Sequence, residues 1–299
     1  MSGAVPPAVS VVIPTHNNEA IVRQCLAAWE RFGPHSLFEL IVVEDGCTDG
    51  TAHFLERLSS TPFGRQHLRS IHLDDVHELR STNAGLRAAA GSIVMAWQDD
   101  MLLEAAWLVP EVIRIFDRHR DIGMMSLSRG LDHFPSASPI DTWDALNDWR
   151  RLRSTIGPFG LNWFRVQEVD TVIRPWIVRH ECLARVGVLD EAFVPTEWDE
   201  ADLAFRIRGA GWRVGTCGYE RLGGYHHLGS STVGQLSDVY KSRVLNNGSL
   251  FHQRWDDAIA RDHARTRRSW RRPQTAAAWM NTCRAIVARG CQRTLELSR

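Results

Sequence analysis

Two adjacent carboxylates stand at the end of the apolar segment IVMAW, residues 93–97. The segment leads into Gln98, Asp99 and Asp100 and then turns apolar again. Adjacent carboxylates repel each other and are costly to remove from water. They therefore either lie solvated in a surface turn or belong to a site that expects a positively charged group.

Further acids follow apolar segments elsewhere in the chain. Glu44 and Asp45 end the run FELIVVED, and Asp199 and Glu200 open the amphipathic segment of PTEWDEADL. A positioned carboxylate can accept hydrogen bonds or act as a general base. Acids at the start of a helix are also what the helix dipole alone favours, so that interpretation stays open.

The segments that must position these acids alternate between two periodicities. The pattern predicts strands at 8–14, 38–46, 68–74, 92–97 and 122–128, and helices at 20–32, 48–58, 86–91 and 104–119, with a loop at 78–85. Such alternation predicts an α/β fold with a mainly parallel sheet flanked by helices. Ligands bind outside the carboxyl ends of the strands in these sheets, which is where the acids occur.

The composition excludes several classes of protein. The 299 residues are 44% hydrophobic and 23% charged, and 35 basic residues balance 35 acidic ones, which disfavours a nucleic-acid binder. No apolar run approaches the ~18 residues of a membrane-spanning helix, and the N-terminus lacks the features of a signal peptide. The six cysteines form no Cys-x-x-Cys pair, so we expect reduced thiols in a cytoplasmic protein.

Six motifs occur in one order along the chain: VSVVIPTHNN, ELIVVEDGCTDGT, STNAGLRAAAG, AWQDDM, WDEADLAFRIRGAGWRV and YHHLGSST. Each is weak alone, but together they resemble the bacterial type of inverting family 2 glycosyltransferases. The resemblance covers about residues 8–255. It implies a Rossmann-like GT-A fold and transfer of a sugar from a nucleoside-diphosphate sugar to a hydroxyl acceptor with inversion.

The resemblance implies a donor site at the carboxyl ends of the first strands. The predicted donor-binding residues are Pro14, Thr15, Glu44, Asp45, Arg80, Asn83, Gly85, Gln98 and Asp99. A carboxylate at 44–45 would accept hydrogen bonds from the base or ribose, and the loop STNAG would close over the ribose and phosphates. For Thr15 a helix cap, and for Arg80 a solvated position, are the alternatives.

The QDD motif stands where the family has its Asp-x-Asp motif, which implies a divalent cation, Mn²⁺ or Mg²⁺, that neutralises the diphosphate as a Lewis acid. Asp100 matches the second acid of that motif and is a predicted ligand. Gln98 replaces the first acid and brings no charge, so we expect weaker metal affinity. The late histidine segment makes His227 the other predicted ligand, with a structural histidine as the alternative.

The WDEADL motif resembles the acidic motif that starts a helix below the acceptor site. Glu200 aligns with the catalytic base, which deprotonates the attacking hydroxyl, and Asp199 with its acidic neighbour. A shift of one residue would exchange these roles.

Twelve tryptophans are more than a core of this size needs. Trp176 and Trp198 are predicted to contact the acceptor as apolar platforms for sugar rings, and Trp143, Trp149 and Trp163 are further candidates. Core packing is the alternative for each of them.

The chain changes character after Trp255. We predict a catalytic domain at 1–255, with a donor-binding half at about 1–128 and an acceptor-binding half at about 129–255, followed by a helical basic tail at 256–299. From Arg254 onward the chain has 11 arginines and 4 acids. This tail would pack on the domain, form a homo-oligomer, or contact the inner face of a membrane that carries a lipid-linked acceptor.

Two other functions compete with an active transferase. A catalytically decayed protein that binds sugar nucleotides or glycans is compatible with the loss of the first acid of the cation motif. A nucleotidyltransferase is disfavoured because PTHNNEA lacks the glycines and lysine of its usual loop. The sequence does not separate a UDP, GDP or dTDP donor, nor name the glycan or lipid-linked acceptor.

Overall fold

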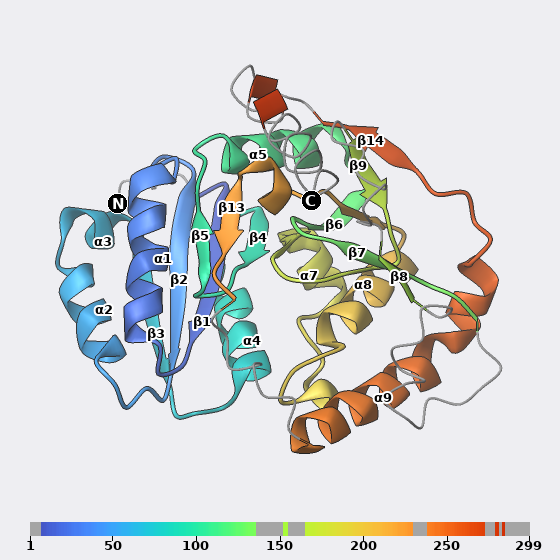
Figure 1. Ribbon diagram of the computed structural model, residues 1–299, viewed down its shortest axis with the longest axis horizontal. Helices are drawn as coiled ribbons and strands as arrows, with labels where there is room; N and C mark the ends of the chain where they lie inside the picture. Colours follow the sequence, from blue (N-terminus) through green and yellow to red (C-terminus); the bar gives the residue numbers. More distant parts are fainter. Residues whose placement is uncertain are drawn as a thin grey trace, which may run out of the picture.

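The computed structural model of the protein describes residues 7–135, 165–229 and 238–272, together with the short stretches 152–154, 279–280 and 283–284. Within these residues, nine strands form one sheet in the order β14-β9-β12-β6-β11-β4-β1-β2-β3 (Figure 1). Strands β9 and β11 run opposite to the others. The predicted α/β fold with a mainly parallel central sheet is confirmed.

The strands of the large sheet are β1 (Val9–Thr15), β2 (Phe38–Asp45), β3 (Leu68–Leu73), β4 (Ile93–Ala96), β6 (Ile122–Ser126), β9 (Arg165–Glu168), β11 (Trp176–Arg179), β12 (Arg213–Thr216) and β14 (Ser269–Arg271). Two small sheets comprise β10 (Thr171–Val172), β7 (Gly130–His133) and β8 (Leu152–Ser154), and β13 (Tyr225–His227) with β5 (Met101–Leu103).

The helices are α1 (Glu19–Phe32), α2 (Thr51–Ser59), α3 (Pro62–His67), α4 (Glu78–Ala88), α5 (Leu108–Arg118), α7 (His180–Val186), α8 (Asp199–Gly209) and α9 (Asp238–Asp262), with 3₁₀ turns η1 (Glu191–Phe193) and η2 (Glu220–Leu222). Among the described residues, no helix is both long enough and apolar enough to cross a membrane.

Hydrophobic clusters cover both faces of the large sheet. Helices α1, α2, α3 and α5 pack on one face, and α4, α7, α8 and α9 on the other. Strand β1 shows why: Val9, Val11 and Ile13 point into the first cluster and Val12 into the second. A strand buried on both faces reads as a continuous apolar run, as this one does.

Helix α4 begins eight residues before the position predicted from the sequence. The motif STNAG lies inside this helix rather than in a loop. Gly85 explains the close packing, because a Cβ at this position would lie 2.2 Å from Val12 Cγ1 on strand β1. Tertiary packing therefore overrides the loop-like composition of 78–85.

The predicted helical tail is corrected for its described part. Its boundary after Trp255 falls inside α9, and the chain that follows continues along the edge of the molecule to β14, which pairs with β9 (Figure 1). We call residues 263–272 the C-terminal strap. Strand β14 extends the central sheet, so the strap is part of the domain.

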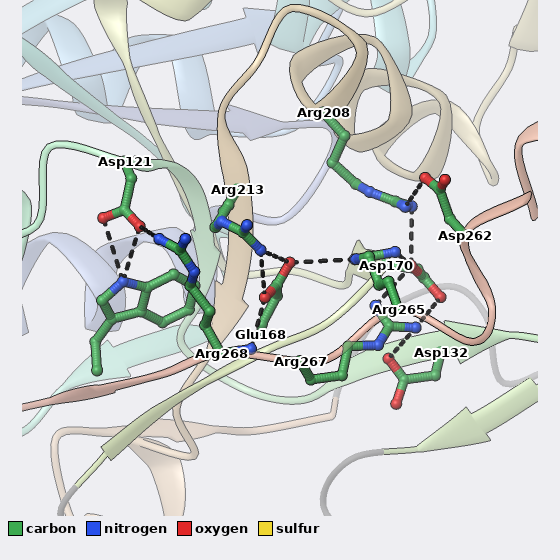
Figure 2. Close-up of polar contacts among 11 residues, drawn as sticks. Asp121, Asp132, Glu168, Asp170, Arg208, Arg213, Asp262, Arg265, Arg267 and Arg268 are labelled. Atoms are coloured by element: carbon green, nitrogen blue, oxygen red, sulfur yellow. Dashed lines mark hydrogen bonds and ion pairs between the residues drawn. The ribbon is translucent and has the colours of Figure 1, made fainter.

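The arginines of the strap pair with acids in and around β9 and, at the end of the strap, with an acid of α5 (Figure 2 shows those around β9). Arg265 and Arg267 donate to Asp170 at 2.7–2.8 Å, and the backbone N–H of Arg268 donates to Glu168. At the end of the strap, Arg272 Nε donates to Glu111 Oε1 at 2.7 Å, and both side chains are completely buried.

Candidate functional site

The carboxyl ends of β1, β2 and β4 meet at one edge of the sheet. Thr15 at the end of β1 pairs in register with Glu44 of β2, and Val12 pairs with Ala96 of β4. The turn Gln98–Asp100 follows β4 after one residue, Trp97. The structure thus brings the first two acidic clusters together, as the parallel sheet predicted from the sequence requires.

Asp99 ties the turn after β4 to the loop after β1. Its Oδ2 accepts hydrogen bonds from Thr15 Oγ1 at 2.7 Å and from Asn18 Nδ2 at 3.0 Å. Burial raises the pKa of Asp99 and the charge of Asp100 adds to the rise, although the two hydrogen bonds oppose it. The side chain of Gln98 makes no hydrogen bond within the described residues, so it is available to a ligand.

Glu44 and Asp45 are buried beneath the same edge. Glu44 accepts hydrogen bonds from the Cys47 N–H and from His72 Nδ1. Burial alone would raise the pKa of Glu44, but these partners lower it below its ordinary value. Asp45 Oδ1 accepts from the Val76 N–H at 2.8 Å, while Oδ2 accepts no hydrogen bond within the described chain. Asp45 is therefore the better placed of the two to receive a donor N–H or O–H.

Three of the predicted donor contacts have structural partners instead. Asn83 is buried, and its amide group exchanges two hydrogen bonds with the backbone of Leu189, at 2.8 and 2.9 Å. Arg80 is paired with Glu191 at 3.1 Å, and Gly85 packs against β1. We do not carry these three residues into the functional proposal. Pro14 stays within β1, half-buried beside Thr15.

Asp100 and His227 face each other beside this edge. Asp100 is buried, and its Oδ2 lies 3.2 Å from His227 Nε2. This hydrogen bond raises the pKa of His227; burial opposes it, and the charges of Asp100 and Glu220 add to it. Strand β13 is fixed by pairing with β5 and by the Leu228 N–H, which donates to the Asp100 carbonyl at 2.9 Å.

The pair fits a divalent cation in part. Asp100 Oδ1 is buried and has no hydrogen-bond partner among the described residues. A buried carboxylate oxygen in this state is unsatisfied, and a bound cation would satisfy it. A carboxylate with an imidazole suits Mn²⁺. In the described residues no group of three or more His, Cys, Asp or Glu side chains could hold a metal. The remaining ligands would therefore be water and substrate oxygens, as is usual for Mg²⁺.

The acidic start of α8 reaches the same edge through β11. Trp176, which opens β11, pairs with Ala96, which ends β4, so the preceding Arg174 lies close to the turn after β4. Arg174 donates to Glu78 at the start of α4 and lies 3.4 Å from Asp199 Oδ2. Arg174 was not predicted as a site residue, because the sequence IRPW contains no local signal for this bridge.

Asp199 and Glu200 are adjacent carboxyl groups in different surroundings. Asp199 is completely buried, and its Oδ1 lacks a hydrogen-bond partner within the described residues. Burial first, and then the charge of Asp199, raise the pKa of Glu200 well above its ordinary value, while Arg174 acts to lower it. A carboxyl group with a raised pKa, near the sheet edge where ligands bind in such folds, is typical of a group that transfers protons.

The turn before α8 is held in an unusual conformation. Glu197 and Trp198 both have left-handed backbone angles, with φ of 77° and 69°. Such non-glycine residues cost about 1–3 kcal/mol each and persist where their surroundings hold them. Asn247 of α9 does so by donating to the carbonyls of Phe193, Thr196 and Glu197 at 2.8–3.3 Å. Helix α9 therefore holds the acidic turn in place.

The tryptophans predicted to bind the acceptor lie in packed environments. Trp176 is completely buried between β4 and β6, so its prediction as a sugar platform is corrected. Its ring packs into the hydrophobic cluster on the face of the sheet that α4, α7, α8 and α9 cover, which leaves it no exposed surface. Trp198 packs with Phe251 at 5.0 Å between ring centroids and is half-buried. Trp143, Trp149 and Trp163 lie outside the described residues.

Comparisons with known proteins agree with this geometry. Residues 10–162 match the family described as glycosyl transferase family 2. The chain is 31% identical over 112 residues to glycosyltransferase AglD of Haloferax volcanii, covering 36% of this chain and 18% of the relative. It is 23% identical over 231 residues to human polypeptide N-acetylgalactosaminyltransferase 18, covering 70% and 36%. The chain therefore spans well under half the length of these curated relatives.

Two solved structures share the fold. One is the mannosyltransferase PcManGT from Pyrobaculum calidifontis in complex with GDP-Man and Mn²⁺, with a TM-score of 0.50 and 18% identity, covering 97% of this chain and 81% of that one. The other is GalNAc-T7 with UDP, GalNAc and Mn²⁺, with a TM-score of 0.61 and 12% identity, covering 84% and 49%. The GT-A fold expected from the motifs is confirmed.

Proposed function

The chain belongs to glycosyl transferase family 2, and from that premise we propose that it transfers a sugar from a nucleoside-diphosphate sugar to a hydroxyl group with inversion at the anomeric carbon. One observation carries the proposal: Asp45, Asp100 and the start of α8 meet at the carboxyl edge of one sheet. This edge would therefore offer a contact for the nucleotide, a cation site for the diphosphate and a base for the acceptor hydroxyl.

The nucleotide would lie over the ends of β1 and β2. Asp45 Oδ2 is available to accept a hydrogen bond from the base or ribose, and the side chain of Gln98 is available to the ribose. Asp99, fixed by Thr15 and Asn18, keeps the turn after β4 in register with β1. The two fold relatives that contain GDP-Man or UDP support this class of donor.

Asp100 and His227 would hold a divalent cation, Mn²⁺ or Mg²⁺. When bound, such a cation neutralises the charge that develops on a departing diphosphate. The unpartnered Oδ1 of Asp100 and the Mn²⁺ in both fold relatives support this assignment. Because Gln98 carries no charge, Asp100 and His227 would be the two cation ligands that the protein supplies.

Glu200 would act as the base. Its carboxylate takes the proton of the acceptor hydroxyl as the hydroxyl oxygen bonds to the anomeric carbon from the face opposite the nucleotide. The bond between that carbon and the phosphate oxygen breaks, and the nucleoside diphosphate leaves with its electron pair. A positioned base contributes about 10²–10⁴-fold to such a step.

The test is a panel of UDP, GDP and dTDP sugars with Mn²⁺, followed by release of the nucleoside diphosphate. We expect slow hydrolysis of one donor, and NMR of the product should show the inverted anomer. Binding of a donor without any hydrolysis would favour the decayed binding protein. Binding of none of the donors would contradict both functions.

The domain limits and cellular setting belong to the same proposal. We keep a donor-binding half at about 1–128, an acceptor-binding half from 129, a glycan or lipid-linked acceptor, and a cytoplasmic location with contact to a membrane face as the alternative. The described arginines from Arg254 to Arg272 are largely paired within the protein, which supports packing of this segment over membrane contact.

A further inference from the structure

A cavity of about 250 Å³ opens at the carboxyl ends of β6 and β12. Its lining residues are Ser128, Arg129, Gly218, Glu220 and Arg221. This volume lies below the ~300–1,000 Å³ of a pocket for a whole small molecule. It therefore suits one group of a larger ligand whose remainder lies outside.

The cavity lies beside the proposed reaction centre. Trp176 of β11 pairs with Ala96 of β4 on one side and with Ser126 of β6 on the other, so these two strand ends are level. Two strand spacings separate them, which is on the order of 10 Å. The turn η2, which contributes Glu220 and Arg221 to the lining, is followed three residues later by β13, which carries His227.

The strand order also decides on which side of the centre the cavity lies. The proposed nucleotide site is over β1 and β2, the turn of Asp100 follows β4, and β6 and β12 come next beyond β11. Because Asp100 stands between the two regions, the cavity faces the reaction centre from the side away from the nucleotide. That is the side from which an inverting acceptor must approach.

The two arginines of the cavity have no partner among the described residues. In the part of the chain that the structure describes, Arg129 and Arg221 form no hydrogen bond or ion pair, and neither pairs with Glu220. Eight other arginines of this half are paired with carboxylates, namely Arg174, Arg206, Arg208, Arg213, Arg265, Arg267, Arg268 and Arg272. Two guanidinium groups and one carboxylate leave the cavity with one net positive charge.

The walls of the cavity are held by backbone contacts between the two loops. The Cys217 N–H donates to the Ser126 carbonyl at 3.1 Å, and the Tyr219 N–H donates to the Leu127 carbonyl at 2.8 Å. Thr216 Oγ1 donates to the Ser128 carbonyl at 3.2 Å. The arginines are therefore carried on preformed loops, which lowers the entropic cost of binding.

We propose that this cavity binds an oxyanion of the acceptor, a phosphate or a carboxylate, through Arg129 and Arg221. Planar guanidinium groups match both anions with paired N–H donors. Glu220 would accept a hydrogen bond from a hydroxyl of the attached sugar, and its negative charge would limit the affinity for the anion. The proposal rests on the proposed function, because it names the acceptor class for that reaction.

The test uses glucose, glucose 6-phosphate and glucuronate as probes for calorimetric binding to the full chain in EDTA, without donor. We expect at least one acidic sugar to bind more tightly than glucose. Arg129→Gln and Arg221→Gln should each weaken that binding about tenfold. Glu220→Gln should tighten it about twofold to fivefold, because a like charge is removed. The control is Arg118→Gln, an exposed arginine of α5 near the opposite edge of the sheet.

The outcomes separate this inference from the proposed function. Tighter binding of glucose 6-phosphate alone assigns a phosphate, and of glucuronate alone a carboxylate. Equal binding of all three sugars, no binding of either acid, or equal losses in the Arg118 variant would overturn the inference. Donor hydrolysis by the unaltered protein is measured separately, and its failure would count against the proposed function alone. Thermal melts identify any variant that has lost its fold, and Arg129→Lys and Arg221→Lys then serve in its place.

Discussion

At the residue scale, the start of α8 sets two neighbouring acids in different surroundings. Asp199 is fully buried against Arg174, whereas Glu200 is half-buried and has a raised pKa. A base is most effective when its pKa lies near the working pH, and it must be reachable by the acceptor. The partial exposure of Glu200 meets the second requirement and the complete burial of Asp199 does not, so we favour Glu200 as the base.

Glu200→Gln is expected to keep donor binding and to lose transfer by about 10²–10⁴-fold. The change removes the proton acceptor while it preserves the size of the side chain. Calorimetry with the donor and a turnover assay measure the two effects separately. Unchanged turnover would make Glu200 a helix-terminus acid, and Asp199→Asn would be the next variant to test.

The raised pKa of Glu200 also predicts a pH dependence of stability. The fold prefers the neutral form, so the stability that Glu200 contributes is present below its unfolded pKa and is lost as pH rises through the folded pKa. The amide in Glu200→Gln stays neutral at all pH values. The melting temperature of the variant, relative to that of the unaltered protein, should therefore increase as pH rises. Parallel melting curves from pH 5 to 9 would contradict the assignment.

Asp100→Asn tests the cation site. Losing one charged ligand should remove several kcal/mol of leaving-group stabilisation. We expect donor hydrolysis to stop, and Mn²⁺ affinity measured with bound nucleoside diphosphate to fall. Asp117→Asn, an exposed acid of α5, is the matched control. Full hydrolysis in EDTA would remove the metal from the mechanism.

At the element scale, Arg174 joins three parts of the fold. It sits before β11 and contacts Glu78 of α4 and Asp199 of α8. These partners are 96 and 25 residues away in sequence, so the bridge exists only in the folded chain. We infer that Arg174 is a positioning residue for the acidic start of α8.

Arg174→Gln is expected to lower stability and to change the pH profile. Leaving Asp199 as an unpaired buried charge costs about 3–5 kcal/mol. Because Arg174 acts to lower the pKa of Glu200, its loss should shift the acidic limb of the pH–rate profile to higher pH. Arg174→Lys should restore part of this shift. A destabilised variant with an unshifted limb would mean that Arg174 is only structural.

The sequence predicted those features that depend on local pattern. Strands β1, β2 and β4 and the acids that follow them lie at the predicted places, because strand periodicity and parallel topology determine both. The start of α4, the burial of Trp176 and the two hydrogen bonds of Asn83 depend on distant partners. Local sequence could not reveal these contacts, nor that Arg129, after β6, and Arg221, in η2, would line one cavity.

At the scale of the whole molecule, the strap closes the sheet and neutralises its acids. Burial alone would raise the pKa of Asp170, but Arg267 and Arg208 hold it well below its ordinary value. Glu168 accepts from Arg213 and from the Arg268 N–H, and Glu111 is paired with Arg272. Three buried carboxylates therefore depend on residues that the sequence analysis assigned to an appendage.

The last prediction concerns two truncations. A protein ending at Arg272 keeps β14 and the strap, and we expect its melting temperature and donor binding to match the full chain. A protein ending at Trp255 loses the last turns of α9, exposes the edge of β9 and leaves Glu111 without its arginine. An unpaired buried charge costs about 3–5 kcal/mol, and an exposed sheet edge promotes aggregation.

Arg267→Gln tests the same argument without deletion. Because the folded pKa of Asp170 is lowered, the stability it contributes is present above its unfolded pKa and is lost as pH falls through the folded value. The variant should therefore be less stable than the unaltered protein at neutral pH and should lose less stability on acidification.

Co-sedimentation with anionic vesicles, at low and high salt, tests membrane contact. Binding by the full chain but not by the protein ending at Arg272 would locate that contact in residues 273–299. Full stability of the protein ending at Trp255 would show that the strap is dispensable and would restore the boundary predicted from the sequence.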